Sequence, residues 1–323
     1  MPRYELSQSE KLFSWDKESH HEDKCLRKVF WNLIWVVLAV FEFSVSSWVR
    51  AESVLSWKKE SFSFALADGT QLNAQVQRPV LDVASGNHAL PLVLIFGGFQ
   101  DAAKVLSFFK TADPAVFATF DYPFVAERRF HFPQSLFLVS DAKRTVHQTL
   151  EGILLFRKIL VDRGGVDPRR CSIIGASMGA PFALVSGARD PGFSGVVLIH
   201  GFGNAPEVIT HQLNRSWIPK VGGWIRPLTW MMGQSAGLYL GLGALEDYAL
   251  QFQEQQKILM ISAERDSFVP RETSDSLWEA LQKSKAQVER VMMSGDHVQP
   301  GAQDLVDELV KNSTQWMKKN QLL

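Results

Sequence analysis

The chain has 323 residues, of which 46% are hydrophobic and 21% charged, and it carries no formal net charge when its histidines are neutral. This length and composition are those of a globular protein with a sizeable buried core, and α/β folds of this size often form one domain. The neutral balance and the lack of a Lys/Arg cluster exclude an electrostatic footprint for nucleic acid. The two cysteines, Cys25 and Cys171, form no Cys-x-x-Cys pair, so neither a zinc site nor a redox motif is indicated.

Residues 1–51 form a polar region followed by an apolar segment. Residues 29–41 are apolar apart from Asn32, and as a helix this run reaches about 20 Å, short of the roughly 30 Å hydrocarbon core of a bilayer. Extending the segment to residue 49 gives sufficient length but adds Glu42 and several serines. The run therefore has the length of a signal-peptide core or a buried helix rather than a full membrane span.

The residues that flank this apolar run give information on the cellular location of the protein. Basic side chains within residues 24–28 favour an amino end in the cytoplasm, and Val49 and Ala51 have the spacing of a signal-peptide cleavage site. Three interpretations stay open: an export signal with a long polar start, an uncleaved signal-anchor, and an amphipathic helix packed on the domain. We predict export or membrane association through residues 29–49, with a cytoplasmic location as the alternative.

Residues 52–323 have the pattern of one α/β domain. Residues 61–79 alternate apolar and polar side chains around Asp68-Gly69, which predicts a β-hairpin. Continuous apolar runs, typical of strands buried on both faces, follow at 91–98 and 115–123. Residues 171–175, 195–201, 257–264 and 286–295 continue the series of predicted strands.

Helical spacing of apolar residues separates these runs. It occurs at 140–165, 180–188, 272–284 and 304–318. In the first of these segments Ser140 or Asp141 can cap the start, and Gly164-Gly165 ends the helix. Buried strands that alternate with helices predict a mostly parallel sheet with right-handed crossovers and helices on both faces.

Residues 204–252 interrupt this alternation, because they fill a gap between two strands where one helix would suffice. The segment is rich in Trp, Met and Leu. We expect a small helical cap over the carboxyl edge of the sheet that lines a pocket. An ordinary extra helical pair packed on the core is the alternative.

Gly175 and Gly179 stand two positions either side of Ser177, where an apolar strand sequence becomes helical sequence. A strand that enters a helix through a tight turn strains the residue at the bend, and side chains two positions away would collide with their neighbours. Glycine removes these collisions and leaves the serine hydroxyl exposed at the sheet edge. A helix N-terminus there favours developing negative charge. The pattern predicts that Ser177 is a nucleophile.

A serine nucleophile needs a base and an orienting acid. Asp266 comes just past the end of one predicted strand and His297 just past the next, so all three residues fall at one edge of the sheet. Glu264 is the weaker candidate for the acid, because it lies within the strand end. Asp296 is interpreted as a turn residue.

One further histidine-containing pattern occurs in the chain. His200-Gly-Phe-Gly imitates the oxyanion loop of a lipase but lies after the serine, so His200 is interpreted as a structural or supporting histidine. No HExxH motif, paired carboxylates or phosphate loop occurs, so no metal or cofactor is expected.

From about residue 62 to its end the chain resembles the α/β-hydrolase superfamily. "GGVDPRRCSIIGASMGA" (164–180) and "AERDSFVP" (263–270) are most similar to its dienelactone-hydrolase and prolyl-oligopeptidase-like branches. The resemblance implies a mostly parallel eight-stranded sheet and a Ser177–Asp266–His297 triad. It also implies an oxyanion hole formed by the amide of Met178 and a second amide after the third strand, that of Phe99 or Gly98.

We therefore expect a serine hydrolase that cleaves acyl esters, like a carboxylesterase or a lipase. Its substrate would be a hydrophobic acyl ester among small molecules, and no cofactor is expected. A peptidase, a thioesterase or an acyltransferase would use the same triad and stays an alternative. A binding protein of this fold without catalytic activity is an alternative of another class.

Overall fold

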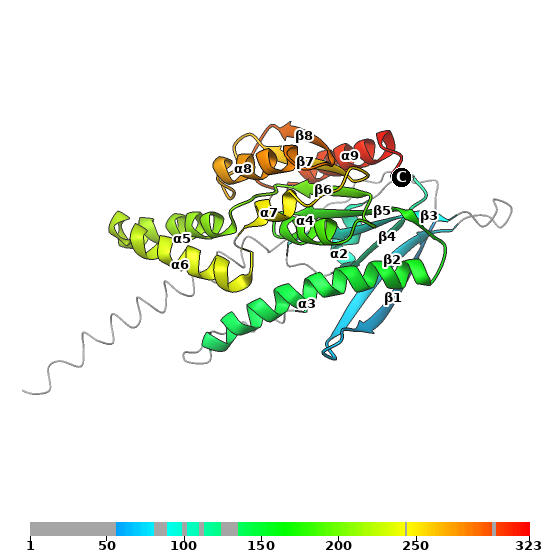
Figure 1. Cartoon of the computed structure of the whole chain (residues 1–323), viewed down its shortest axis with the longest axis horizontal. Coiled ribbons are helices and arrows are strands. Elements are labelled where there is room, and N and C mark those ends of the chain that lie inside the picture. Colours follow the sequence, from blue (N-terminus) through cyan, green and yellow to red (C-terminus); the bar gives the residue numbers. More distant parts are fainter. Residues whose placement is uncertain are drawn as a thin grey trace, which may run out of the picture.

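The computed structural model describes residues 56–80, 89–98, 102–109, 113–123, 135–242, 244–298 and 302–323. Our expectations for residues 1–51, including export or membrane association through 29–49, lie outside the described residues, as does Phe99. The described chain folds around one eight-stranded sheet in the order β1-β2-β4-β3-β5-β6-β7-β8 (Figure 1).

The amino-terminal edge of the sheet is the predicted hairpin. β1 (Trp57–Ala65) and β2 (Gln71–Pro79) pair antiparallel, and β2 also pairs antiparallel with β4. The turn between them needs glycine at residue 69, where φ is +86°, and Asp68 Oδ1 accepts the Thr70 N–H at 2.9 Å. The alternating pattern of the sequence is thus explained by an edge pair with one face on the core.

The other strands are parallel and form the centre and the far edge of the sheet. They are β3 (Leu90–Phe96), β4 (Val116–Phe120), β5 (Val166–Ala176), β6 (Gly195–Ile199), β7 (Lys257–Ala263) and β8 (Gln287–Met293). All five residues of β4 and all five of β6 are buried. The apolar sequences of β4 and β6 therefore mark strands covered on both faces, whereas β8, at the edge of the sheet, has one buried residue.

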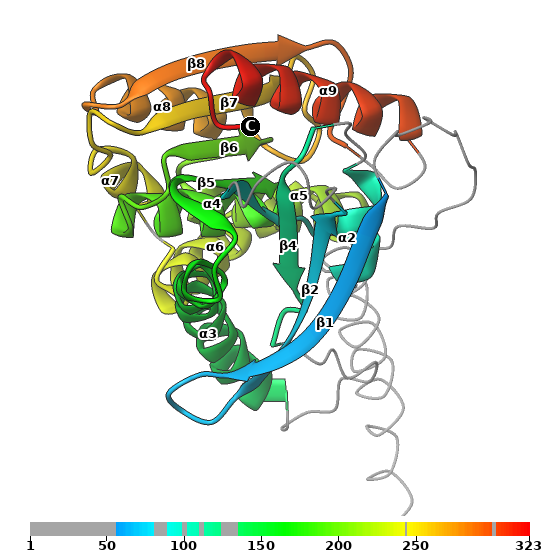
Figure 2. The same cartoon turned by 90° about the vertical axis from the view of Figure 1, so that its right-hand side faces the viewer.

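Helices cover both faces of the sheet, with α3 and α4 on one side and α2 on the other (Figure 2). One core packs α3 (Ser135–Asp162), α4 (Gly179–Arg189) and α8 (Arg271–Gln282) against the sheet. The second core packs α2 (Ala102–Phe108) and α9 (Gln303–Lys319) against the opposite face. The fold is a doubly wound α/β arrangement with the strands' carboxyl ends at one edge.

Two helices differ from the sequence prediction. α3 begins at Ser135 rather than at a cap formed by Ser140 or Asp141. No glycine or proline separates Pro133 from residue 140, so the helix extends back over residues 135–139. α2 was not predicted; its short apolar face contacts the second core, and Asp121 Oδ1 accepts its first N–H, that of Ala102, at 2.8 Å.

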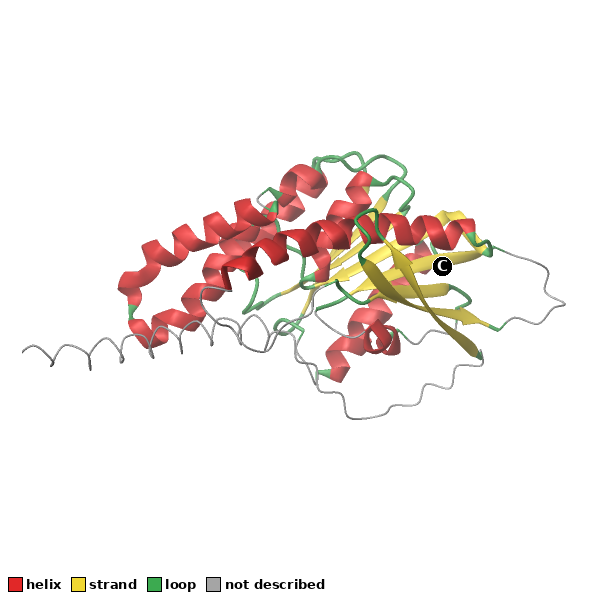
Figure 3. Cartoon of the chain, turned by 90° about the horizontal axis from the view of Figure 1, so that it is seen from below, coloured by secondary structure: helices red, strands yellow, loops and turns green. Residues whose placement is uncertain are grey.

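The insertion between β6 and β7 contains a helical hairpin that projects beyond the sheet (Figure 3). It consists of α5 (Ala205–Val221), the 3₁₀ turn η2 (Gly223–Ile225) and α6 (Arg226–Leu240). The two helices approach closely because Gly233 and Gly237 face Thr210 and Pro206, where a Cβ would lie 2.1–2.3 Å from the nearest atom. α7 (Leu245–Ala249) follows, and its buried side chains belong to the core that also contains α3, α4 and α8, rather than to the hairpin.

Among the described residues no helix has both the length and the apolar character needed to cross a membrane.

Candidate active site

Ser177 lies at the turn between β5 and α4. Its backbone has φ +53°, a left-handed conformation that is uncommon outside glycine, and its N–H donates to the Ile199 carbonyl at 2.8 Å. The side chain is half-buried. The strained turn therefore holds the hydroxyl at the carboxyl edge of the sheet, directly before the N-terminus of α4.

The two flanking glycines occupy positions that admit no side chain. A Cβ at Gly175 would lie 2.3 Å from the Gly179 carbonyl oxygen, and a Cβ at Gly179 would lie 2.1 Å from the Phe96 carbonyl oxygen. Both contacts are with backbone atoms, which cannot move aside as a flexible side chain can. The close approach of α4 to β3 and β5 thus requires both glycines.

His297 follows β8 and reaches Ser177. Its Nε2 lies 2.9 Å from Ser177 Oγ, a hydrogen-bond distance, and the residue is 4% exposed. Its backbone N–H donates to Asp296 Oδ1, and so does the N–H of Ser267. Asp296 therefore acts as a turn residue that ties the loop after β8 to the loop after β7.

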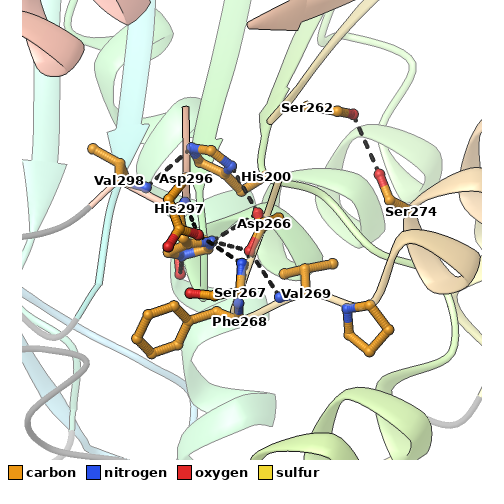
Figure 4. Close-up of polar contacts among 12 residues, drawn as sticks. His200, Ser262, Asp266, Ser267, Phe268, Val269, Ser274, Asp296, His297 and Val298 are labelled. Atoms are coloured by element: carbon orange, nitrogen blue, oxygen red, sulfur yellow. Dashed lines mark hydrogen bonds and ion pairs between the residues drawn. The ribbon is translucent and has the colours of Figure 1, made fainter. Parts of the chain in front are cut away.

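Asp266 lies in the loop after β7 and faces the other side of the His297 ring (Figure 4). Its carboxylate oxygens are 2.9 and 3.0 Å from His297 Nδ1. Oδ1 also accepts the N–H groups of Phe268 and Val269 at 2.9 and 2.8 Å. Glu264, the weaker candidate for the acid, is exposed.

A second imidazole contacts the same carboxylate. His200, directly after β6, places Nδ1 3.0 Å from Asp266 Oδ2, and its ring lies 4.5 Å from the His297 ring between centroids (Figure 4). Its Nε2 accepts the Val298 N–H at 3.3 Å. Because an ionised carboxylate only accepts, the Nδ1 of His200 carries the proton and Nε2 the lone pair.

Electrostatics fix the protonation of this cluster. Burial opposes ionisation of Asp266, but the hydrogen bonds from His200 and His297 outweigh it and hold the pKa of the carboxyl well below its usual value. Burial lowers the pKa of His200, and the hydrogen bond to Asp266 only partly opposes this effect. A neutral His200 beside an ionised Asp266 follows from these shifts.

The hairpin helix α5 holds the loop that carries Asp266. His211 Nε2 lies 3.2 Å from the Ser267 carbonyl oxygen, and Arg215 donates to the same oxygen at 2.7 Å. The Arg215 guanidinium also lies over the Phe268 ring, which in turn lies 5.0 Å from the His297 ring. Sequence patterns gave no signal for these contacts, because α5 and the loop are far apart along the chain.

An apolar cavity of about 80 Å³ opens beside Ser177. It lies between α2 and α9 under the carboxyl ends of β3 and β5, and none of its described lining residues comes from 204–252, so the expectation that this insertion lines the pocket is wrong. Its lining includes Val105 and Phe108 from α2, Ile174 and Ala176 from β5, and Val306 and Leu309 from α9. The lining side chains are apolar apart from the hydroxyl of Ser177, so the cavity suits a hydrocarbon group attached to a carbonyl at that hydroxyl.

The structure describes two of the three backbone amides that were expected as hydrogen-bond donors near Ser177, those of Met178 and Gly98. Met178 directly precedes α4, at the positive end of the helix dipole. Gly98 is buried and lines the cavity, and the loop that bears it is held by Tyr122, whose hydroxyl donates to the Gly97 carbonyl at 2.7 Å. Phe99, the other residue whose amide was expected as the second donor, lies outside the described residues.

Among the described residues, His200, Asp266 and His297 form a group whose nitrogen and oxygen atoms lie within 4.8 Å of one another, close enough for metal ligands. Both Nδ1 atoms, however, carry protons that bond Asp266, and the two Nε2 atoms contact Ser177 and the Val298 N–H. A metal ion would have to displace these protons. The ligand atoms that a metal ion would need are thus already engaged in hydrogen bonds.

A hydroxyl, an imidazole and a carboxylate in hydrogen-bonded series at the carboxyl edge of this sheet define a serine hydrolase with the α/β-hydrolase fold. Residues 141–321, more than half of the chain, match the family model described as the prolyl oligopeptidase family. The chain belongs to that family. No match is found among curated protein sequences.

Solved structures share the fold at low sequence identity. An acetyl xylan esterase from Paenibacillus sp. R4 is 14% identical with a TM-score of 0.56, over 88% of this chain and 93% of the esterase. An esterase from Pyrococcus furiosus is 16% identical with the same TM-score, over 86% of this chain and 96% of the esterase. An acylaminoacyl peptidase from Pyrococcus horikoshii is 12% identical with a TM-score of 0.55, over 82% of this chain but only 41% of the peptidase.

Proposed function

We propose that this serine hydrolase cleaves carboxylic esters with a short apolar acyl group, and that Ser177, His297 and Asp266 are its catalytic triad. The observation that carries the proposal is the apolar cavity of about 80 Å³ that opens at Ser177, whose hydroxyl hydrogen-bonds His297. An engineered apolar cavity of about 150 Å³ binds benzene, so a cavity of half that size favours an acyl chain of a few carbons.

The proposed reaction passes through an acyl-enzyme. His297 Nε2 takes the proton of Ser177 Oγ as the oxygen attacks the ester carbonyl, and the resulting imidazolium returns this proton to the departing alcohol. Water then attacks the acyl-serine with the same help from His297, releasing the carboxylic acid and restoring the serine. Asp266, with its lowered pKa, stays ionised throughout and stabilises the imidazolium.

The negative charge of the tetrahedral intermediate needs donors fixed in advance. In the proposed mechanism the Met178 amide supplies one, at the N-terminus of α4, and the loop with Gly98 and Phe99 supplies the other. Loss of one such donor reduces turnover by about 10²–10³-fold in other enzymes.

We assign His200 a positioning role. It donates to the Asp266 oxygen Oδ2 and accepts from the Val298 backbone, so it links the carboxylate to the loop that carries His297. As a neutral residue it neither competes with His297 for the serine proton nor repels the imidazolium. Its hydrogen bond keeps Asp266 ionised and oriented.

A fluorophosphonate probe together with a panel of p-nitrophenyl esters tests the proposal. We expect labelling of the wild-type chain, none of Ser177→Ala, and the highest kcat/KM between acetyl and butyryl esters. Ser172→Ala is the matched control, because Ser172 is buried in β5 away from the cavity lining. Equal ester hydrolysis by Ser177→Ala and the wild type would refute the proposal.

Peptide bond cleavage is the second candidate, and membership of the prolyl oligopeptidase family favours it. The chain spans 41% of the length of the similar acylaminoacyl peptidase, so the activity of that whole protein does not carry over directly. Aminoacyl p-nitroanilides, assayed beside the esters, separate the two candidates. A kcat/KM higher for the anilides than for the butyryl ester would favour the peptidase.

A further inference from the structure

The tip of the α5–η2–α6 hairpin exposes an unusual number of large apolar side chains. Of the ten that the described residues expose, five lie here, and we call them the hairpin-tip surface: Val221, Trp224, Leu228, Trp230 and Met231. Trp224 is 75% exposed. Leu238 and Tyr239 are exposed too but lie at the other end of α6, where Gly237 faces Pro206 at the start of α5. Contiguous exposed apolar side chains of this kind mark a surface that meets another apolar phase.

The pattern of α6 supports this reading. One side of the helix is buried against α5 through Thr229, Gly233 and Gly237. The opposite side of a helix in a soluble protein normally carries charged residues, but here it carries Leu228, Met231 and Leu238. After Arg226, no charged residue occurs until Glu246. α6 is therefore apolar on both sides, as is typical of a helix that water does not surround.

The charges around the hairpin-tip surface have one sign. Between residues 208 and 245 the chain contains no Asp or Glu, whereas Arg215, Lys220 and Arg226 are all exposed. Lys220 and Arg226 directly flank η2, which bears Trp224. Exposed tryptophan, aliphatic side chains and basic residues without acidic ones are the composition of segments that enter the interface of an anionic bilayer.

We propose that the hairpin-tip surface docks the protein onto the interface of an anionic lipid bilayer. A second copy fits less well, because a symmetric pair would place Lys220 and Arg226 against their own like charges. The apolar residues 29–49 of the same chain are also a poorer occupant of this surface. The basic residues at 24–28 that precede them would be repelled by Lys220 and Arg226. The docking does not depend on the proposed ester hydrolysis.

Site-specific fluorescence on the full chain tests the proposal. In a Cys25→Ser background the remaining native cysteine, Cys171, is buried and unreactive, so a thiol dye reports only on an introduced position. Leu228→Cys places the dye on the hairpin-tip surface, and Leu250→Cys is the matched control at an exposed leucine outside it. The probe is phosphatidylcholine vesicles with or without phosphatidylglycerol.

We expect a blue shift of the dye at residue 228 with phosphatidylglycerol vesicles, a smaller shift at high salt, and none at residue 250. A dye at 228 that is already blue-shifted without vesicles would overturn the proposal, because the protein itself would then cover the surface. Absence of any vesicle-dependent shift at 228, or equal shifts at 228 and 250, would overturn it as well.

Charge reversal gives an independent readout. We expect Lys220→Glu with Arg226→Glu to weaken binding to anionic vesicles by more than tenfold, at about fivefold for each lost basic residue before the added repulsion. Lys283→Glu with Lys285→Glu, at exposed positions after α8, should leave binding unchanged. Hydrolysis of a soluble short ester should be unaffected in both variants, which separates docking from catalysis. Equal binding by the two double variants would contradict the proposal.

Discussion

His200 and His297 approach one carboxylate from two strand ends, each with Nδ1 within 3.0 Å of an Asp266 oxygen. Only His297 reaches Ser177, while His200 turns its other nitrogen to the Val298 backbone. The acid is thus fixed by four donors: two imidazoles and the N–H groups of Phe268 and Val269. An acid held in this way has one orientation available to it.

Replacement of His200 tests its positioning role. We expect His200→Leu to lower kcat by about 10- to 100-fold with little change in KM, since a hydrogen bond to a charged group is lost. His200→Asn should recover most of the activity, because asparagine keeps a donor near the Nδ1 position and tolerates the φ of +52° found at this residue. The assay is steady-state hydrolysis of a short p-nitrophenyl ester. Equal losses in the two variants would indicate a merely structural role.

The lowered pKa of His200 makes stability depend on pH. The unfolded chain takes up a proton at this residue below about pH 6.5, whereas the folded chain, in which burial disfavours the imidazolium, does so only at lower pH. Stability therefore falls as pH decreases from 6.5 toward the folded pKa. Urea unfolding between pH 5 and 7.5 should show this slope, and the slope should be shallower in His200→Asn. An identical slope in both proteins would rule out His200 as its source.

Ionisation of Asp266 contributes at lower pH and in the same direction. Its folded pKa lies below the unfolded value of about 3.9, so its contribution to stability is complete above that value. The contribution is lost only as pH falls through the folded pKa. Acid unfolding of Asp266→Asn should lack this component.

Gly179→Ala tests the close approach of α4 to β3. The added methyl would meet the Phe96 carbonyl oxygen at 2.1 Å, so we expect a loss of about 1–3 kcal/mol in the free energy of unfolding, or failure to fold. Gly223→Ala is the matched control, because a Cβ there meets nothing within 4 Å. Thermal and urea unfolding measure both. Equal stability of the two variants would mean that the backbone at the turn can shift to accommodate the added methyl group.

The acyl cavity can be resized at one residue of α9. Val306 lines the cavity and is 9% exposed. We expect Val306→Ala to move the preferred p-nitrophenyl ester toward a longer chain, and Val306→Phe to restrict the enzyme to acetyl esters. Val185→Ala, buried on α4 in the opposite core, should destabilise the protein similarly without changing chain-length preference. An unchanged preference in both Val306 variants would place the acyl group elsewhere.

Strands and the serine turn could be read from the sequence because their physical constraints are local. A strand buried on both faces must be continuously apolar, as residues 92–96 are, and the turn at Ser177 needs glycine at two fixed positions. Asp266 and His297 could be predicted as the acid and the base because parallel strands end at the same edge of the sheet. The early start of α3 was missed, since nothing between Pro133 and residue 140 marks a boundary.

Other features depend on packing between distant segments and left no trace in the sequence. His200 was interpreted from the sequence as a structural or supporting histidine, but its bond to Asp266 was not predicted, because that bond requires β6 and β7 to be neighbours. The cavity beside Ser177 is bounded by α2 and α9, which are separated by most of the domain. The contacts of Arg215 and His211 with the Ser267 carbonyl likewise arise only once the chain is folded.

These last contacts restrict how the enzyme can be engineered. Because His211 and Arg215 of α5 contact the Ser267 carbonyl beside Asp266, excising the hairpin would release this loop from the helix that holds it. A minimal version of the protein must keep residues 205–217 even if everything beyond them is replaced by a short linker. None of the described residues that line the cavity comes from the hairpin, so its contribution to the candidate site is to support the loop that carries Asp266.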